Sequence, residues 1–513
     1  MVYLVGAGPG DPGLITRRGA ELLARAEVVI HDQLVNRRLL ELVPPSAVVI
    51  AAGKTSGRHL IPQDQINQLL WEQATAGRMV VRLKGGDPLV FGRGGEEAEF
   101  LAQAGIRFEI VPGVTAAVGA AAYAGIPITL RGEASAAALI TGHNDPEAPE
   151  SSPDRLDWTA LARFPGTLIV YMGMTHLPAI CRVLIREGRD PETPSAVVEA
   201  GTLPRQRVIE GPLERIAELA RGAGARPPAL LVVGTVVRRR SRLSWFETLP
   251  LFGQRIVVTR PWDEARRSAE QLESMGAEAI VAPTVEIAPL ADPSPLDAAI
   301  GALEQYQWIV FTSANGVRFF LDRLLDRGRD LRALGHARLA AIGPGTADAL
   351  ARFRLHADLV PDSYRSEALA ESLAERAAGT RILLARADRG RDILRQRLSC
   401  LAQVDQVAVY QNRDVARLSD EVVERIEGGS VDWITLTSSA IASRLHALLP
   451  ETARRRVGSE IRLASLSPVT SETIRALGWP VGVEASSATW ESLVTAIVER
   501  IGSDRLNQEQ RVS

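Results

Sequence analysis

Residues 82–97 read Arg82-Leu-Lys-Gly-Gly-Asp-Pro-Leu-Val-Phe-Gly-Arg-Gly-Gly-Glu-Glu97, and the architecture of the first half of the chain follows from this stretch. A short apolar segment, 79–83, leads into it, and a helical pattern, 96–104, follows it. Glycines let a backbone adopt positive φ and approach a ligand closely. The stretch is therefore predicted to be a loop at the carboxyl end of a strand, where open α/β sheets bind ligands. A tight surface turn is the alternative.

The same order of strand, loop and helix repeats through the first 135 residues. Glycine- and proline-rich loops follow four predicted strands, at 6–13, 53–57, 85–95 and 112–116. Alternating strands and helices indicate a parallel sheet, so these loops should meet at one edge. From about Leu139 a strand-rich segment predicts a second α/β lobe.

Composition and charge exclude several classes of protein. The 513 residues are 46% hydrophobic and 23% charged, with a net charge of −2, which favours neither nucleic acid nor a membrane surface. Cys181 and Cys400 lack metal-ligand spacing, and neither a signal peptide nor a run long enough for a membrane span is visible. We therefore expect a cytoplasmic protein without a metal site. Of 59 basic residues only Lys54 and Lys84 are lysines, both in glycine-flanked loops.

A dinucleotide-binding fingerprint is a tempting interpretation of the first loop. Gly8, Gly10 and Gly13 have the required spacing, and Asp32 follows the next predicted strand. However, the loop also contains prolines, which carry no backbone N–H for a pyrophosphate. The predicted helix begins after the last glycine instead of on it. The sequence therefore argues against a dinucleotide site.

Several motifs together resemble uroporphyrinogen-III C-methyltransferase of the tetrapyrrole methylase family. They begin at Val2 (Val-Tyr-Leu-Val-Gly-Ala-Gly-Pro-Gly-Asp-Pro), His31 (His-Asp-Gln-Leu-Val), Val81 (the stretch quoted above), Val111 (Val-Pro-Gly-Val-Thr-Ala) and Val170 (Val-Tyr-Met-Gly). The resemblance covers about 1–243. It implies two α/β lobes that bind folded S-adenosylmethionine, a homodimer, and methylation of uroporphyrinogen III at C2 and C7 to precorrin-2.

The resemblance also implies roles for individual residues. It makes Asp32 a proton acceptor and Lys54 a proton donor, and gives Lys84 no catalytic role. The implied cofactor contacts are Pro9, Gly85, Gly86, Asp87, Val90, Thr115, Ala116, Met172 and Gly201.

The chemistry of C-methylation agrees with these roles. A sulfonium methyl is already electrophilic, so the reaction needs alignment of a carbon nucleophile more than acid–base help. Methylation of a pyrrole carbon leaves a cation that must lose a proton, and a carboxylate such as Asp32 is a suitable acceptor; a solvated loop aspartate is the alternative. The substrate is rich in carboxylates, for which seven arginines near the loops are candidate ligands. They are Arg17, Arg18, Arg37, Arg38, Arg82, Arg93 and Arg131.

A boundary is predicted after residue 243. The run Arg238-Arg-Arg-Ser-Arg242 suggests nucleic acid, but five residues in a neutral chain are more typical of a solvated linker, placed at 244–252. The last residues, 502–513, are predicted to be a flexible polar tail.

The second half contains a weak internal duplication with an offset of about 125 residues. Trp308-Ile-Val-Phe-Thr-Ser313 resembles Trp433-Ile-Thr-Leu-Thr-Ser438, and residues 338–346 resemble 462–470. Two copies of one α/β unit should therefore form two lobes. Their Thr-Ser strand ends and helix N-termini are of the kind that holds anions, which makes Ser313, Thr346, Ser438 and Thr470 candidate carboxylate donors.

This architecture resembles the uroporphyrinogen-III synthase family over about 253–500. The resemblance implies closure of hydroxymethylbilane to uroporphyrinogen III without a cofactor, and it matches Tyr410 to the family's best-placed tyrosine. It implies a synthase at 253–501, with one lobe of 253–288 plus 413–501, a second of 290–411, and crossings near 288–291 and 410–414.

The two resemblances predict a bifunctional enzyme, because the synthase makes the substrate of the methyltransferase. The small-molecule partners are then hydroxymethylbilane and uroporphyrinogen III. Two alternatives stay open: a methylase that acts on a later precorrin, and a second half that binds tetrapyrrole without catalysis.

Overall fold

The computed structural model describes the chain except residues 53–60, 148–155, 390–391 and 513, and it contains two compact units. Unit 1 comprises Met1–Arg255, Leu272–Glu278 and Ile501–Ser513. Unit 2 comprises Ile256–Gln271 and Ala279–Arg500. Mixed α/β structure runs through both units, as predicted.

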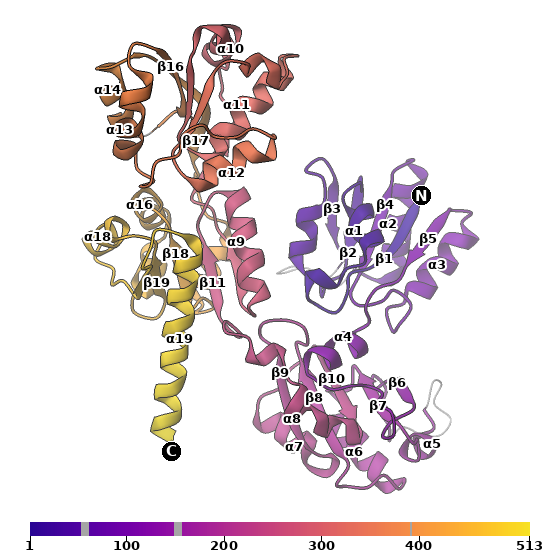
Figure 1. The fold of residues 1–513 in the computed structure, drawn as a ribbon. Helices are drawn as coiled ribbons and strands as arrows, with labels where there is room; N and C mark the ends of the chain where they lie inside the picture. Colours follow the sequence, from indigo (N-terminus) through magenta and orange to yellow (C-terminus); the bar gives the residue numbers. More distant parts are fainter. Residues whose placement is uncertain (53–60, 148–155, 390–391, 513) are drawn as a thin grey trace. The chain divides into compact units, whose positions relative to one another are not determined.

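The first sheet has five parallel strands in the order β3-β2-β4-β1-β5 (Figure 1). The strands are β1 (Val2–Gly6), β2 (Val28–His31), β3 (Val48–Ala51), β4 (Val80–Lys84) and β5 (Phe108–Val111). The helices between and after them are η1 (Pro12–Leu14), α1 (Arg17–Leu23), η2 (Arg37–Leu42), α2 (Gln63–Thr75), α3 (Gly94–Gln103) and α4 (Ala116–Tyr123). The predicted parallel sheet is confirmed, and its carboxyl-terminal strand ends share one edge.

The central strands β1, β2 and β4 are buried on both faces of this sheet, which explains why apolar residues predominate in them. Val81 and Leu83 of β4 belong to one core cluster, which also contains Leu22 of α1. Val80 of β4 belongs to the cluster on the other face, which contains Leu70 of α2. The sheet is therefore a rigid platform for the loops at its edge.

The second sheet of unit 1 has the order β6-β7-β10-β8-β9. Only β6 and β7 are parallel, and the other neighbours are antiparallel. Its strands are β6 (Ala137–Thr141), β7 (Thr167–Tyr171), β8 (Pro194–Glu199), β9 (Arg207–Pro212) and β10 (Ala229–Val233). Its helices are α5 (Trp158–Ala162), α6 (Leu177–Arg186) and α7 (Leu213–Gly222). The predicted second lobe is thus an α/β layer of mixed strand direction.

The segment after β10 folds onto unit 1, so the prediction of a solvated linker is wrong. It forms η3 (Thr235–Arg239), α8 (Arg240–Leu243) and η4 (Phe246–Thr248). Arg240 forms ion pairs with Glu210 and Glu247, and Phe246 and Leu251 are buried. The basic run therefore neutralises carboxylates of unit 1, and its aromatic neighbours supply the apolar contact that a free linker would lack.

One sheet of the second half has the order β12-β11-β18-β19-β20. Its strands are β11 (Arg255–Val258), β12 (Glu278–Val281), β18 (Trp433–Leu436), β19 (Arg462–Ser465) and β20 (Val483–Glu484). Its helices are α9 (Trp262–Ser274), α15 (Asp420–Glu427), α16 (Ser439–Leu448), α17 (Glu451–Arg456), α18 (Pro468–Ala476) and α19 (Trp490–Val512). Because α19 reaches Val512, the predicted flexible tail is helical; residues 503–512 contain neither proline nor glycine to end the helix.

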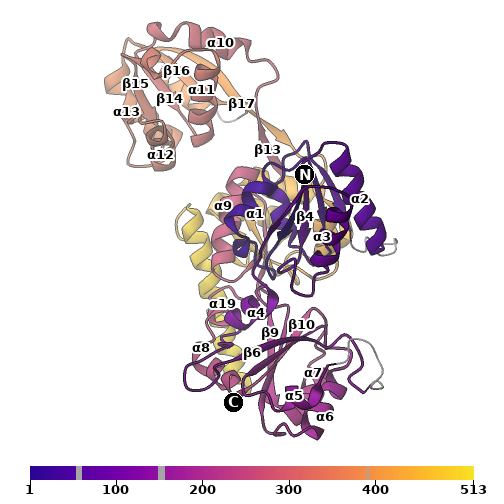
Figure 2. The same cartoon turned by 90° about the vertical axis from the view of Figure 1, so that its right-hand side faces the viewer.

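The other sheet of the second half has the order β13-β17-β16-β14-β15 (Figure 2). Its strands are β13 (Val285–Ala288), β14 (Trp308–Phe311), β15 (Arg338–Ala341), β16 (Arg381–Ala387) and β17 (Gln403–Asp414). Its helices are α10 (Ser294–Gly301), η5 (Leu303–Gln305), α11 (Ala314–Asp326), η6 (Leu331–Leu334), α12 (Pro344–Arg352), α13 (Ser366–Ala377) and α14 (Ile393–Ser399).

The predicted duplication is confirmed by equivalent contacts in the two copies. Arg338 lies over Trp308 with 5.7 Å to the ring centroid, and Arg462 lies over Trp433 at 5.4 Å. Each pair joins the first residues of two neighbouring parallel strands. The two sheets are therefore built around the same local packing.

The first crossing between these sheets lies earlier than predicted. Val285 of β13 pairs with Asp414 of β17, so β13 belongs to the sheet of the 290–411 lobe and not to the 253–288 segment. The Val415 N–H donates to the Thr284 carbonyl, which places both crossings next to each other just outside this pairing. The alternation in Val285–Ala288 predicts a strand but cannot show which sheet the strand joins.

Candidate active site

Three glycines bring the loops after β1, β4 and β5 into contact at the edge of the first sheet. A Cβ on Gly113 would lie 2.2 Å from the Gly86 carbonyl oxygen and 2.8 Å from Gly6 Cα. Gly8 and Gly86 also exchange two backbone hydrogen bonds, of 3.2 and 2.8 Å. Only glycine allows backbones this close, so the predicted convergence of these loops is confirmed.

Asp87 holds two of these loops together. One carboxylate oxygen accepts from the Leu89 N–H at 2.8 Å, and the other accepts from the Gly113 N–H at 3.0 Å. Asp87 is a predicted cofactor contact. It lies at the loop junction, where both of its carboxylate oxygens already accept bonds from the chain.

Pro9 lies against helix α4 at a position where only glycine leaves room. A Cβ on Gly119 would lie 2.4 Å from Pro9 Cγ. Helix α1 begins at Arg17, well beyond Gly13, and only the short η1 helix includes that glycine. The loop therefore lacks the helix N-terminus of a dinucleotide site, in agreement with the sequence argument.

Tyr171 at the end of β7 connects the two lobes of unit 1. Its hydroxyl lies 2.6 Å from Thr115 Oγ1 and accepts from the Ala117 N–H at 2.8 Å. Its ring lies 4.9 Å from that of Phe91. Burial raises the pKa of Tyr171, so the hydroxyl stays protonated and bridges the β5–α4 loop to β7. Met172, a predicted cofactor contact, is the next residue along the chain, whereas the sequence analysis did not single out Tyr171 itself.

We expect Tyr171→Phe to lower the free energy of unfolding by about 1–3 kcal/mol, because the buried Ala117 N–H loses its acceptor. Thermal unfolding of the full chain measures the change. Tyr364→Phe is the matched control, since Tyr364 is exposed, and should change the stability by less than about 0.5 kcal/mol. Equal stability of Tyr171→Phe and the wild type would contradict the bridging role.

Backbone strain concentrates at the same loops. Six non-glycine residues in the described part of the chain have positive φ, and five of them follow β4, β7 or β8. They are Phe91, Arg93, Met172, Ala200 and Thr202. Such conformations are costly and cluster at functional sites, where surrounding contacts hold them. The backbone is therefore strained at Met172 and on both sides of Gly201, which are two of the predicted cofactor contacts.

Gly201, another predicted cofactor contact, lies against α4. A Cβ there would be 2.3 Å from Ala120 Cβ. Val90 packs against the core cluster that contains Ala120 and Tyr171. Gly201 therefore lies against α4, and Val90 packs against the core cluster to which α4 contributes.

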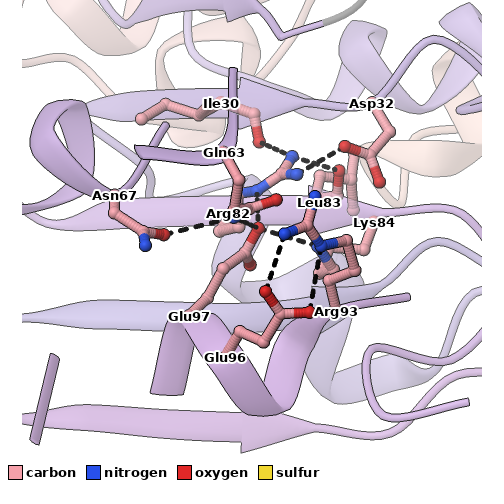
Figure 3. A network of polar contacts seen from close by, with 10 residues as sticks. All are labelled: Ile30, Asp32, Gln63, Asn67, Arg82, Leu83, Lys84, Arg93, Glu96 and Glu97. Atoms are coloured by element: carbon pink, nitrogen blue, oxygen red, sulfur yellow. Dashed lines mark hydrogen bonds and ion pairs between the residues drawn. The ribbon is translucent and has the colours of Figure 1, made fainter. Parts of the chain in front are cut away.

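Asp32 follows β2 at the same sheet edge and is held by β4 (Figure 3). Its N–H donates to the Leu83 carbonyl at 3.1 Å, and Arg82 Nη2 lies 2.5 Å from its Oδ1. The Asp32 side chain is 33% exposed, so a ligand can reach it. The Arg82 side chain is only 2% exposed, which rules out its predicted role as a ligand for substrate carboxylates.

Lys84 is also buried, at the next position on the same face of β4. Its Nζ lies 2.8 Å from Glu97 Oε1, and both side chains are almost fully enclosed. Burial first, and the Arg82 charge second, lower the pKa of Lys84. The family resemblance gave Lys84 no catalytic role, and in the structure its charge lies in this buried ion pair. Lys54, the predicted proton donor, lies outside the described residues.

Other candidate arginines already contact carboxylates of the chain. Arg17 pairs with Glu21, Arg18 with Glu109, Arg38 with Glu41, and Arg93 with Glu96. To bind substrate carboxylates, these arginines would have to exchange their present carboxylate partners for those of the substrate. Glu97 and Tyr171 were missed by sequence reasoning. The signal for Glu97 was available, because two cations on a buried strand require an anion nearby.

In the second half, Tyr410 of β17 contacts the N-terminal end of α11. Its hydroxyl lies 3.2 Å from Ser313 Oγ, and its ring stacks on Phe319 at 5.6 Å. Burial raises the pKa of Tyr410, which keeps the phenol neutral. Ser313 and Ser438 cap α11 and α16, so these predicted carboxylate donors already accept backbone N–H groups.

The described residues offer neither a metal-binding cluster nor a membrane-spanning helix. No group of three His, Cys, Asp or Glu side chains in these residues could hold a metal ion. No helix in the same part of the chain has both the length and the apolar character needed to span a membrane.

Comparisons with known proteins agree with this geometry. Residues 1–217 match the family described as Tetrapyrrole (Corrin/Porphyrin) Methylases, and residues 266–495 match Uroporphyrinogen-III synthase HemD. The porphyrin biosynthesis protein HemD of Ruminiclostridium josui is 38% identical over 86% of this chain and 87% of that protein. The uroporphyrinogen-III C-methyltransferase of Bacillus subtilis (strain 168) is 40% identical over 71% of this chain and 74% of that protein.

A crystal structure of a similar protein is also known. The uroporphyrin-III C-methyl transferase from Thermus thermophilus, complexed with S-adenyl homocysteine, is 43% identical, with a TM-score of 0.39 over 46% of this chain and 98% of that one. By its family matches and its two long relatives, the chain belongs to the tetrapyrrole methylases in its first half and to the uroporphyrinogen-III synthases in its second.

Proposed function

We propose that the chain closes hydroxymethylbilane to uroporphyrinogen III in its second half and methylates that product at C2 and C7 in its first half, giving precorrin-2. Family membership of both halves supports the two activities. The observation that carries the methyltransferase assignment is the meeting of Asp32 and the glycine loops at one sheet edge.

S-adenosylmethionine is the proposed methyl donor, and the residues at the edge suit it. Leu34 follows β2, Leu89 follows β4 and Met172 follows β7, and they expose 65%, 55% and 49% of their surface, which could provide apolar contact for an adenine ring. The glycine loops provide backbone polar groups at close range. The sulfonium supplies an electrophilic methyl group. We assign the contacts with S-adenosylmethionine to Pro9, Gly85, Gly86, Asp87, Val90, Thr115, Ala116, Met172 and Gly201.

The chain's own residues position the tetrapyrrole substrate and remove a proton from it. The loops would hold the substrate and the cofactor next to each other, which would replace a bimolecular encounter by a fixed arrangement. The Asp32 carboxylate accepts the proton that the methylated carbon loses, and its exposed part returns the proton to water. Lys54 is proposed as the proton donor on the sequence resemblance alone.

For the synthase half we propose catalysis without a cofactor, with Tyr410 as a donor to the closing bilane. We expect Tyr410→Phe to slow uroporphyrinogen III formation by about 2–10-fold, since one neutral hydrogen bond is worth about 0.5–1.5 kcal/mol. The ring would keep its stacking on Phe319. A rate assay with hydroxymethylbilane measures the effect, and an unchanged rate would remove Tyr410 from the mechanism.

We further propose that the methyltransferase spans 1–243 and the synthase 253–501, and that the chain works as a cytoplasmic homodimer through its first half. The support is the family resemblance.

Incubation of the full chain with hydroxymethylbilane and S-adenosylmethionine tests the proposal, with precorrin-2 as the expected product. Uroporphyrinogen I alone, the spontaneous product, would show a second half that only binds. Uroporphyrinogen III that is never dimethylated would favour a methylase of a later precorrin.

A further inference from the structure

The carboxyl end of β4 carries two cations on a face that is otherwise apolar. Side chains alternate along a strand, so Val80, Arg82 and Lys84 point to the same side of the sheet. The core cluster on that side contains Val80, Ile30 and Leu70. Isolated charges in such surroundings are strongly unfavourable, so Arg82 and Lys84 require partners.

Glu97 is the anchor for both cations. Its Oε1 receives Arg82 Nε at 3.1 Å, Lys84 Nζ at 2.8 Å and the Gln63 side-chain amide at 3.1 Å. Glu97 is fully buried in the first turn of α3, where the helix dipole favours a carboxylate. The three partners come from α2 and β4, so they fix Glu97 of α3 from two sides (Figure 3).

The Arg82 guanidinium connects this buried anchor to the exposed carboxylate. Nε contacts Glu97, Nη2 contacts Asp32, and Nη1 donates to the Ile30 carbonyl at 3.4 Å. A planar guanidinium held at three of its nitrogens cannot rotate freely. The direction of the hydrogen bond from Arg82 to Asp32 is therefore set by buried residues, which a ligand does not contact.

Stability does not account for this arrangement. Buried ion pairs contribute little net stability, because desolvation offsets the attraction. Glu97 Oε2 is in addition buried without a hydrogen-bond partner among the described residues. Burying this network costs desolvation energy, and the network ends on the Asp32 carboxylate, which a ligand can reach. A function of Asp32 therefore explains the network better than stability does.

We propose that Arg82 is a positioning residue for methyl transfer: anchored by Glu97, its guanidinium holds the Asp32 carboxylate in the orientation that accepts the ring proton. The inference rests on the proposed function of the first half. It replaces the expectation that Arg82 binds substrate carboxylates, and it assigns Glu97 and Lys84 to the support of Arg82.

A double-mutant cycle in the full chain tests the proposal with Arg82→Gln, Asp32→Asn and the combined variant. We expect Arg82→Gln to lower kcat for methylation by about 10–100-fold, with KM for uroporphyrinogen III within about threefold of the wild type. In the Asp32→Asn background, the same change should lower kcat by less than about twofold, because Arg82 then has no carboxylate to position. The proposal would be overturned if Arg82→Gln lowered kcat by the same factor in the wild type and in the Asp32→Asn background. It would also be overturned if Arg82→Gln changed only the KM for uroporphyrinogen III.

Two further variants separate positioning from folding. Arg82→Gln combined with Glu97→Gln removes one charge of each sign, so it should fold while kcat stays low. Arg189→Gln is the matched control: Arg189 is a partly buried arginine of the second lobe that donates to the Phe164 and Gly166 carbonyls. It should lower Tm without lowering kcat. Wild-type kcat in the charge-balanced variant, or an equal loss in Arg189→Gln, would contradict the positioning role.

The wild type and Asp32→Asn distinguish this inference from the proposed function. If the wild type makes precorrin-2 and Asp32→Asn matches its kcat, the positioning role fails although the methyltransferase activity stands. If the wild type makes no methylated product, the proposed function itself fails and the inference with it.

Discussion

Asp32→Asn is expected to slow methyl transfer by about 10²–10⁴-fold while ring closure continues at the wild-type rate. The amide has nearly the same shape as the carboxylate and still accepts a bond from Arg82, but it cannot take a proton. Asp32 lies in unit 1 and the residues assigned to ring closure lie in unit 2, so the two activities should respond separately. Coupled assays with hydroxymethylbilane and S-adenosylmethionine measure both rates in one preparation.

Asp157→Asn is the matched control for this substitution. Asp157 is exposed and caps α5 by accepting the Ala160 N–H, a task that asparagine performs equally well. Both activities should therefore stay at the wild-type level. Loss of ring closure together with methylation in Asp32→Asn would contradict independent sites, and unchanged methylation would remove Asp32 from the reaction.

Local patterns in the sequence were sufficient for most of the strand and loop positions. The segment that ends in Leu83 was predicted to be a strand and forms most of β4, because its apolar run and the following glycines are both local signals. The duplication was visible for the same reason, since Trp308 and Trp433 begin equivalent strands. The meeting of the glycine loops followed from the parallel order of the strands.

Features set by distant contacts could not be predicted. The pairing of Arg82 with Asp32 and Glu97 depends on how β2, β4 and α3 pack, and sequence spacing does not report it. The left-handed backbone at Met172 and Thr202 likewise depends on surrounding structure, because neither residue type favours it. The sheet that β13 joins is a matter of pairing with β17, more than 100 residues away.

Gly113→Ala should have the second large effect, because it forces apart the loops on which the site depends. The new Cβ would lie 2.2 Å from the Gly86 carbonyl oxygen and 2.8 Å from Gly6 Cα, and both contacts are backbone atoms. Gly86 cannot move away easily, since it exchanges two hydrogen bonds with Gly8. We expect a loss of about 3 kcal/mol in the free energy of unfolding of unit 1.

The same displacement should weaken S-adenosylmethionine binding at least about tenfold, because Gly113 also donates the bond that fixes Asp87. Calorimetry gives the stability and the Kd for S-adenosylmethionine, and the rate of ring closure serves as an internal reference for unit 2. Gly222→Ala, in a helix with no atom within 4 Å of the new Cβ, should instead stabilise by about 0.5–1 kcal/mol. If Gly113→Ala matched the wild type in both stability and Kd, close contact of the three loops would not be what shapes the cofactor site, and the glycines at 6, 86 and 113 would need another explanation.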